Sequence, residues 1–558
     1  MAAARSTRAL HAVVIIVLAS APYWGSLRGE FVSDDVQAIV GEPRVHSLAP
    51  ANLRTIFTTR DEPNYIPLKV LSFAIDYQLF GPHPAGYHAE NMALHAANAL
   101  LVYMLLLGLG EGASLALAVS LLWAVHPVNV ESVAWIAERK NVLSMFFFLL
   151  AVLAALRFSA RPRAVTYAAL VAVFTCALLS KVNTVVLPAL MLAYEITERF
   201  RLRARDCLAT VPLLAIGAVV AWANLHDNSV HGVAYHGGSI ARTLQTSSTV
   251  LPRYLELVFF PWHSSFYHAV PLRGSWFEPA VLAGLLLVIG SAATTAWLVV
   301  HRRRGGFWIA WIWLTLAPML NLVPFPALMA DRYLYMPLVG VLVLLARGAQ
   351  AIGERVPAVG RAIPWAAGAA IAAASVLTLV RVPVFHDETS LWADWALRTP
   401  YISAGPWSAG HPPAHTRLLQ EALARDPNSA VLHNNIGAIA FDEGRMQDAV
   451  RELARARQLD PRDPAIALNL GRAYLRVGPP EAALRTLENA VRLEPPSYFA
   501  HMDLGRAYLQ LGDIQDARAA FQRARSIRPE SGEPVWALAQ LEREEQLRHA
   551  TAPQGEPR

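Results

Sequence analysis

The chain has 558 residues, of which 54% are hydrophobic and only 16% are charged. A soluble globular protein carries about a quarter charged residues, so this composition excludes an ordinary soluble domain and points to the membrane. The net charge of +6 does not indicate nucleic-acid binding, because the arginines lie in short clusters between apolar runs. The two cysteines, Cys176 and Cys207, fit neither a metal-binding pattern nor a disulfide framework.

Apolar segments that are long enough to cross a bilayer follow one another through the first two thirds of the chain. A membrane-crossing helix needs about 20 mostly apolar residues. The first segment follows Arg5 and Arg8 and resembles a signal peptide, but we interpret it as an uncleaved span because many further spans follow it. We predict about eleven spans, at residues 10–25, 88–109, 113–129, 141–157, 165–181, 182–197, 207–224, 278–300, 307–323, 334–350 and 364–381.

The arginine clusters predict the orientation of these spans. If the N-terminus is cytoplasmic, the clusters at 157–163, 199–205, 302–304 and 347–361 all lie on the cytoplasmic side, as the positive-inside rule requires. An odd number of spans then places everything after about residue 382 on the opposite face. The Ala-rich and Arg-rich composition favours a bacterial inner membrane with a periplasmic C-terminal domain. In a eukaryote, the same topology would mean the endoplasmic reticulum membrane and its lumen.

A unit of 34 residues repeats three times between residues 428 and 529. Glycine recurs at one position of the unit and proline closes it, as seen at Gly437, Gly471 and Gly505 and at Pro461, Pro495 and Pro529. Small residues allow the paired helices to pack closely, and proline ends the second helix. This is the period and pattern of tetratricopeptide repeats, which usually bind peptides or partner proteins through a concave face.

We therefore predict an all-α protein in which a polytopic membrane helix bundle precedes a tetratricopeptide-repeat solenoid. The transmembrane domain is expected at residues 1–383, followed by a connecting segment and a degenerate repeat at 384–427. Three repeats occupy 428–529, and a capping helix with a tail occupies 530–558.

Polar residues that this topology places on the external face form the candidate site. We predict Asp34 and Asp35, which open the first external loop, as catalytic residues. The predicted substrate-binding residues are His126, Glu131, Glu138, Arg139, Lys140, Lys181, Asp331, Arg332 and Tyr333. Charged groups at a membrane boundary are costly unless they are paired or used, so this gathering on one face indicates an active site at the bilayer boundary.

Lysine usage supports the same interpretation. Lysine occurs only at Lys69, Lys140 and Lys181, and all other basic side chains apart from histidine are arginine. A compact ammonium group serves as a point charge for phosphate where a planar guanidinium does not fit. All three lysines fall on or near the predicted external face.

Each of these motifs also has a purely structural interpretation. An adjacent Asp pair is more often a solvated turn or a helix cap. Arg139 and Lys140 together are typical of an anchor for lipid headgroups, although such anchors favour the cytoplasmic side. Asp331 and Arg332 would form a salt bridge that stabilises a turn, and His126 with Pro127 would cap the third span.

Six motifs, which follow one another along nearly the whole chain, carry a resemblance to a known family. They are FVSDDVQAIVGEPRVHSL, LFGPHPAGYHAENMALHAANALLVY, WAVHPVNVESVAWIAERKNVLS, ALLSKVNTVVLP, PMLNLVPFPALMADRYLYMPLVG and HDETSLWADWALRTP. In this series the chain resembles the transmembrane and tetratricopeptide repeat-containing O-mannosyltransferases, which are membrane glycosyltransferases of the C-type fold with many bacterial relatives. Three positions differ from the usual family pattern, namely Ile66, Asn141 and Val182.

The resemblance implies transfer of a mannose-like sugar, with inversion, from a polyprenyl or dolichyl phosphate to a hydroxyl of a protein acceptor. Asp34 or Asp35 would take the proton of that hydroxyl. Arg139, Lys140, Lys181 and Arg332 would hold the charge that grows on the departing phosphate. We expect no metal ligand among these residues, with a divalent metal as an alternative cofactor. The expected partners are the lipid-phosphate sugar, membrane lipid and an acceptor protein recruited by the repeats, and no nucleic acid.

Two other function classes stay open at this stage. In the first, the protein is a non-enzymatic scaffold whose repeats bind a partner and whose spans only anchor them. In the second, it transports lipid-linked sugars, which predicts charged residues at mid-membrane depth within the spans. The inner stretches of the predicted spans are nearly free of charge, and this counts against transport.

Overall fold

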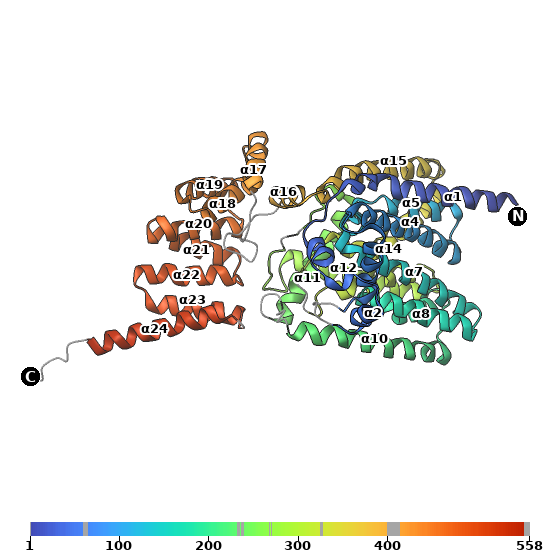
Figure 1. Cartoon of the computed structure of the whole chain (residues 1–558), viewed down its shortest axis with the longest axis horizontal. Coiled ribbons are helices and arrows are strands. Elements are labelled where there is room, and N and C mark those ends of the chain that lie inside the picture. The colour runs from blue at the N-terminus through green and yellow to red at the C-terminus, as the bar shows by residue number, and fades with distance from the viewer. Residues whose placement is uncertain are drawn as a thin grey trace, which may run out of the picture.

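The computed structural model describes residues 2–59, 65–230, 235, 239–266, 268, 270–323, 327–398, 413–529 and 531–551. Within these ranges all regular secondary structure is helical, so the predicted all-α class is confirmed. A bundle of long helices forms the first part of the chain, and a stack of helix pairs forms the second (Figure 1).

Seven helices in the described part of the chain are long and apolar enough to cross a membrane. They are Ser6–Arg28, Pro84–Gly108, Ile136–Ala160, Ala204–Asn224, Pro279–Val300, Pro337–Arg355 and Pro357–Phe385. In the same order they overlap with α1 (Ala2–Ser20), α4 (Pro84–Gly108), α7 (Arg139–Ala160), α10 (Ala204–Val230), α12 (Pro279–Val300), α14 (Pro337–Arg355) and α15 (Pro357–Arg381). The side chains of α12 are almost entirely on the outside of the bundle, where an apolar surface suits contact with lipid.

A bent pair brings the number of such helices in the described residues to at most eight, and three further apolar helices are shorter than a membrane-crossing helix needs to be. The pair joins α5 (Ala113–Ala124) to Pro127–Ala134, which ends in α6 (Val130–Ala134), with a bend of 53°. The bend falls at Pro127, whose nitrogen carries no hydrogen to continue a helical ladder. The shorter helices are α8 (Ala164–Ser180), Val182–Thr197 with α9 (Leu187–Thr197), and Gly306–Met319 with α13 (Gly306–Leu316). Each of the eleven predicted segments coincides with one of these helices.

The arginine-rich connections lie together at one end of the bundle. Arg199 donates from Nη1 to the Ser159 hydroxyl at 2.8 Å, and this contact joins the connections after α7 and α9. The backbone N–H of Gly305, after α12, donates to Glu198 at 3.0 Å. Arg347, on the distal half of α14, donates to Glu111 at 2.9 Å. We call this the arginine end, and the end of the bundle that holds the first turn of α7 is the site end.

Three helices outside the predicted spans build up the rest of the membrane domain. They are α2 (Pro50–Thr58), α3 (Pro67–Phe80) and α11 (Ile240–Phe259). α3 packs on α4 and α8, and α11 packs on α12. A buried aromatic core joins α4, α5 and the start of α14 and fixes how these helices pack on one another. In this core Trp123 donates to the Tyr335 carbonyl at 2.9 Å, and the Tyr335 hydroxyl lies 2.8 Å from His95 Nδ1.

The repeat stack follows the predicted 34-residue period. Its pairs are α18 (Ala430–Asp442) with α19 (Met446–Leu459), α20 (Pro464–Val477) with α21 (Pro480–Leu493), and α22 (Tyr498–Leu511) with α23 (Ile514–Ile527). The recurring glycines lie where the two helices of a pair touch. A Cβ added at Gly437, Gly471 or Gly505 would come within 2.7, 2.6 or 2.5 Å of Leu453, Leu487 or Phe521, so only glycine permits this approach.

Further helices flank the repeats. α16 (Glu388–Arg398) and α17 (Pro413–Arg425) precede them, and α24 (Gly532–Thr551) follows where the capping helix is predicted. Part of the predicted connecting segment, 399–412, and the predicted tail, 552–558, lie outside the described residues. α16 lies between the bundle and the stack (Figure 1). Its Trp395 and Ala396 pack with Leu432 and Ile436 of α18, so α16 belongs to the hydrophobic core at the start of the stack.

Candidate functional site

The two predicted catalytic aspartates have opposite environments. The side chain of Asp35 is fully buried, whereas Asp34 is exposed. The Asp35 carboxylate accepts hydrogen bonds from the backbone N–H groups of Val32 at 3.1 Å and Ala137 at 2.5 Å. The two carboxylates point in different directions because they are adjacent residues of a helical turn. Ser33, just before the pair, has a φ of +52° and sets the orientation of this turn as a whole. Asp35 therefore anchors the loop on the connection before α7, and Asp34 is presented to solvent.

Burial raises the pKa of Asp35 to about 7, although the two backbone N–H groups and the charge of Lys69 act in the opposite direction. The ordinary pKa of an aspartate is about 4. Asp35 in the folded protein therefore takes up a proton at a higher pH than an ordinary aspartate does.

The raised pKa of Asp35 gives a testable pH dependence. Between about pH 4 and the raised pKa, the folded protein binds more protons at Asp35 than the unfolded chain does, so this group makes stability fall as pH rises. Asp35→Asn is expected to flatten that part of the profile of apparent Tm against pH, measured in detergent. Asp34→Asn is the control, since the charge of Asp34 makes only a minor contribution to the raised pKa of Asp35 and its loss should change the profile much less. A profile that keeps its slope in Asp35→Asn would contradict the assignment.

Arg332 is held by two buried glutamates that precede α7. Its side chain forms an ion pair with Glu131, and its backbone N–H donates to the same carboxylate at 2.8 Å. Its Nε lies 3.5 Å from Glu138 Oε1. The guanidinium also lies over the rings of Trp135 at 6.0 Å and Tyr333 at 5.4 Å. The structure therefore brings four predicted site residues together, and it pairs Arg332 with Glu131 in place of the neighbouring Asp331.

Two of the three lysines join this cluster. Lys140 Nζ lies 3.0 Å from Glu138 Oε1. Asn141 donates to the other Glu138 oxygen at 2.8 Å and accepts a hydrogen bond from Lys181. Asn141 is one of the positions that differ from the family pattern, and its amide supplies both a donor and an acceptor where a carboxylate would only accept. It thus links Lys181 to Glu138 without adding a further negative charge.

A small polar cavity opens beside these cations. Its lining comes from the ends of several helices and consists of Asn141, Lys181, Asn183, Thr315, Met319, Arg332, Tyr333, Tyr335 and Met336. Lys181 Nζ lies 6.0 Å from the centre of the Tyr333 ring, so the two cations of the cavity flank this tyrosine. A site that combines an ammonium, a guanidinium, amides and a hydroxyl suits an anionic oxygen ligand such as phosphate.

Arg139 is part of a separate cluster. It is fully buried and forms ion pairs with Asp76 on α3 and with Glu90 on α4, the latter at 3.1 Å. It also donates to Asn91 at 2.8 Å and lies over the Phe73 ring at 4.7 Å. Burial, reinforced by Glu90, raises the pKa of Asp76 to about 8 despite the charge of Arg139. The sequence singled out Arg139 but gave no sign of its partners, which lie about fifty to sixty positions away.

The other two predicted residues also have protein partners. His126 accepts from the Val128 N–H at 3.4 Å, and its Nε2 lies 3.1 Å from the Val258 carbonyl on α11. His126 thus caps the short helix after the bend and also ties it to α11. Asp331 is buried and lies 2.6 Å from Nε2 of His268, a residue that the sequence did not single out.

One further contact to the aspartate loop comes from the start of α16. The Ser33 N–H donates to Glu388 Oε2 at 2.7 Å, and the Glu30 N–H donates to the His386 carbonyl at 2.7 Å. These residues belong to the HDETSLW motif, which the sequence marks only as part of the family resemblance. No local pattern indicates that this motif meets a loop 355 positions earlier.

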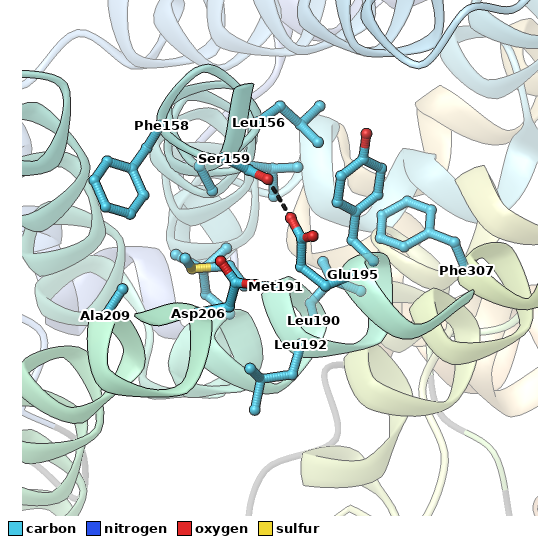
Figure 2. Close-up of a pocket in the computed structure, with 14 residues that line it drawn as sticks. Leu156, Phe158, Ser159, Leu190, Met191, Leu192, Glu195, Asp206, Ala209 and Phe307 are labelled. Carbon is cyan, nitrogen blue, oxygen red and sulfur yellow. Dashed lines mark hydrogen bonds between the residues drawn. The ribbon is translucent and has the colours of Figure 1, made fainter. Parts of the chain in front are cut away.

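A second pocket lies at the arginine end of the same helices (Figure 2). Its wall is mostly apolar, with Leu190, Met191 and Phe307 among the lining side chains, and Glu195 points toward Ser159 within it (Figure 2). Ser159 is 19 positions from Lys140 on α7, which corresponds to about 30 Å along a helix. This pocket is therefore distinct from the polar cavity.

A groove on the repeats is the third hollow surface. It is lined by Phe441, Arg472, Leu475, Arg476, Phe499, Met502, Asp503, Arg506, Gln510 and Glu533. Arg472 and Arg506 both pair with Asp503, whereas Arg476 is exposed. Exposed arginine, aromatic and amide groups in one groove suit an extended peptide. Among the described residues, no group of three or more His, Cys, Asp or Glu side chains is placed to hold a metal ion.

Comparison with known proteins supports both parts of the chain. The tetratricopeptide repeat family model matches residues 408–464 and 468–532, and a second model of the same family matches 440–495. The predicted repeats are thereby confirmed. Among solved structures, MamA is 24% identical, with a TM-score of 0.23, over 24% of this chain and 80% of its own. A thermophilic tetratricopeptide repeat protein of Thermus thermophilus is 17% identical, with a TM-score of 0.24, over 35% of this chain and 97% of its own.

Curated relatives are protein O-mannosyl-transferases. The chain is 40% identical over 141 residues to mouse TMTC1, 35% identical over 150 residues to human TMTC3 and 31% identical over 160 residues to F38B6.6 of Caenorhabditis elegans. These matches cover 24%, 25% and 27% of this chain and 15%, 16% and 23% of the relatives. The family resemblance noted in the motifs is therefore present in the curated proteins, over about a quarter of the chain.

Proposed function

We propose that this protein is an integral-membrane glycosyltransferase that transfers a mannose-like sugar from a polyprenyl or dolichyl phosphate to a hydroxyl of a protein. The proposal rests on the arrangement of charged residues around a polar cavity at the site end of the bundle. An exposed carboxylate, Asp34, is fixed through Asp35 to the same short connection that carries Glu138 and Lys140. A polar cavity with Lys181 and Arg332 opens beside it. The similarity to protein O-mannosyl-transferases supports the same reaction.

In the proposed reaction, the acceptor oxygen forms a bond to the anomeric carbon while the bond from that carbon to the phosphate oxygen breaks. Asp34 takes the acceptor proton, because a general base must be within reach of the hydroxyl and Asp35 is enclosed. The negative charge moves to the lipid phosphate, where Lys181 and Arg332 stabilise it. Attack from the face opposite the phosphate inverts the configuration of the sugar carbon.

The topology that the arginine clusters predict agrees with the location of the candidate site and the repeats at one end of the bundle. The arginine-rich connections lie at the end opposite the site, and the chain after α15 leaves from the site end, where α16 contacts the Asp34 loop. With the arginine end in the cytoplasm, the site and the repeats both face the periplasm of a bacterium, or the lumen of the endoplasmic reticulum in a eukaryote. The repeats are then on the side where an exported acceptor protein arrives.

Donor binding provides the test of this function. Purified protein in nanodiscs is given polyprenyl-phosphate mannose and an acceptor peptide, and mass spectrometry follows both the glycosylated peptide and the released lipid phosphate. Lys181→Ala is expected to weaken donor binding by about tenfold or more, because it removes a charged partner of the phosphate. Lys181→Arg should restore binding only in part, since the guanidinium is larger and planar.

Lys140→Ala is the matched comparison, because Lys140 pairs with Glu138 but is not among the residues that line the cavity. It should weaken binding less than Lys181→Ala does. If the double alanine variant bound the lipid-phosphate donor as tightly as the wild type does, both lysines would serve only as anchors for lipid headgroups. If the wild-type protein bound the lipid but transferred no sugar from any polyprenyl-phosphate donor, the scaffold interpretation would replace the enzyme.

A further inference from the structure

Ser33 adopts a backbone conformation that an L-residue rarely takes without support. Its φ of +52° lies in the left-handed region, where the Cβ atom makes the conformation unfavourable for every residue except glycine. This conformation starts the turn that leads into Asp34 and Asp35, so it sets how the pair is presented, as described above. The Asp35 carboxylate and the Asp35 N–H both bond to Val32 and close the turn around Ser33, which leaves the Ser33 N–H itself to be held by another group.

Glu388 supplies the group that holds the Ser33 N–H. Its carboxylate accepts from the Ser33 N–H at 2.7 Å and also from the indole N–H of Trp392, one turn further along α16. A hydrogen bond to a carboxylate is stronger than one between neutral groups. The adjacent backbone bond, from the Glu30 N–H to the His386 carbonyl, fixes where the loop meets α16.

The adjacent acidic residue, Asp387, interacts with α16, whereas Glu388 interacts with the loop. Asp387 accepts from the Ser390 N–H at 2.8 Å and from its hydroxyl at 3.1 Å, so Asp387 caps the start of α16. The two adjacent carboxylates therefore divide between the helix and the loop.

We propose that Glu388 is a positioning residue of the glycosyltransferase, which holds Ser33 in its left-handed conformation and thereby presents Asp34 to the acceptor hydroxyl. This inference rests on the proposed function for its effect on catalysis. Glu388 touches neither donor nor acceptor in this role. It acts through the backbone of the loop, so its loss should lower kcat and leave the KM for the lipid donor nearly unchanged.

The kinetic test compares Glu388→Ala with Asp387→Asn in full-length protein. Glu388→Ala is expected to lower kcat about tenfold, since a small displacement of a catalytic group has effects of this order or larger. Asp387→Asn removes one charge at the adjacent position but keeps a good cap, so it should stay within about twofold of wild type. Glu388→Gln, which retains an acceptor oxygen, should fall between the two.

A second substitution separates loop positioning from a general loss of structure. Glycine adopts positive φ without the Cβ penalty. Ser33→Gly should therefore restore at least a third of the lost kcat when it is added to Glu388→Ala, by reducing the energetic cost of the conformation that the side chain of Glu388 normally supports. A damaged fold would not be rescued by a more flexible loop. Equal kcat values for Glu388→Ala and Asp387→Asn, or a double variant no better than Glu388→Ala, would overturn the proposal.

Amide hydrogen exchange gives a measurement that does not depend on activity. In Glu388→Ala the Ser33 amide should exchange about tenfold faster than in Asp387→Asn, because its acceptor has been removed. Unchanged exchange would refute the positioning role even in an active enzyme. If the Ser33 amide exchanged faster in Glu388→Ala but the wild-type protein transferred no sugar, the contact between Glu388 and the loop would be supported and the glycosyltransferase function would be rejected.

Discussion

Asp34→Asn is expected to reduce sugar transfer by about a hundredfold or more, because it removes the base that accepts the proton of the attacking hydroxyl. The substitution keeps the shape of the side chain. Asp34 is exposed, so neither folding nor donor binding should change. The rate is measured on a short acceptor peptide with a saturating lipid-phosphate mannose, and donor binding is measured separately on the same nanodiscs.

Asp35→Asn is the informative comparison. It removes a buried carboxylate whose two oxygens both accept backbone hydrogen bonds, so its loss of activity should be accompanied by altered stability and pH dependence. If Asp34→Asn retained wild-type turnover while Asp35→Asn lost all activity with unchanged stability, the base would be Asp35. Turnover at the wild-type rate in both variants would remove the carboxylate pair from the mechanism.

Removal of the repeats is expected to preserve sugar transfer to short peptides and to reduce sugar transfer to intact proteins. A chain that ends after Arg398 keeps Glu388 on the Asp34 loop and lacks every repeat, whereas a shorter truncation near residue 384 would also remove Glu388. Transfer to a short peptide should persist. Transfer to the intact acceptor should fall by about a hundredfold or more, because tethering by the repeats raises the effective acceptor concentration.

Truncation after Arg398 uncovers Trp395, which packs with the repeats in the whole protein. A full-length variant therefore serves as the control. Arg476→Glu reverses a charge in the groove of the repeats, where Arg476 is exposed, and leaves the ion pairs of Asp503 intact. It should weaken transfer to the protein acceptor without affecting the peptide. If both the truncation and this variant glycosylated the intact acceptor at the wild-type rate, the repeats would serve assembly with another protein.

The sequence predicted the positions of the helices well because each signal is local. The apolar runs and the 34-residue period are visible within one window of the chain, and the structure has a helix at each predicted span. The meeting of Glu131, Glu138, Lys140, Lys181 and Arg332 also followed from the topology, because all of them stand at span ends on one side. The specific partner of each charge did not follow, since the chain order of Asp331 and Arg332 suggests a pair that the folded protein does not form.

Side-chain direction at the start of a helix explains the main difference. Arg139 and Lys140 are adjacent, but successive helical residues point about 100° apart. Arg139 therefore enters the cluster of Asp76 and Glu90, while Lys140 turns to Glu138. The side chains of Asp34 and Asp35 differ in direction for the same reason, and the orientation of the pair as a whole depends on the dihedral angle of Ser33, which a serine in the sequence does not reveal.

The contact between Ser33 and Glu388 also sets an order of events during biosynthesis. The two residues are 355 positions apart, so the ribosome needs tens of seconds, at about 5–20 residues per second, to add the second after the first. With Glu388 in the positioning role, a nascent chain whose membrane helices have already been inserted transfers sugar slowly until α16 emerges. The repeats are the next segment to be synthesised. Full activity and acceptor recruitment then become available almost together, and an incomplete chain consumes less of its lipid donor on unselected hydroxyl groups.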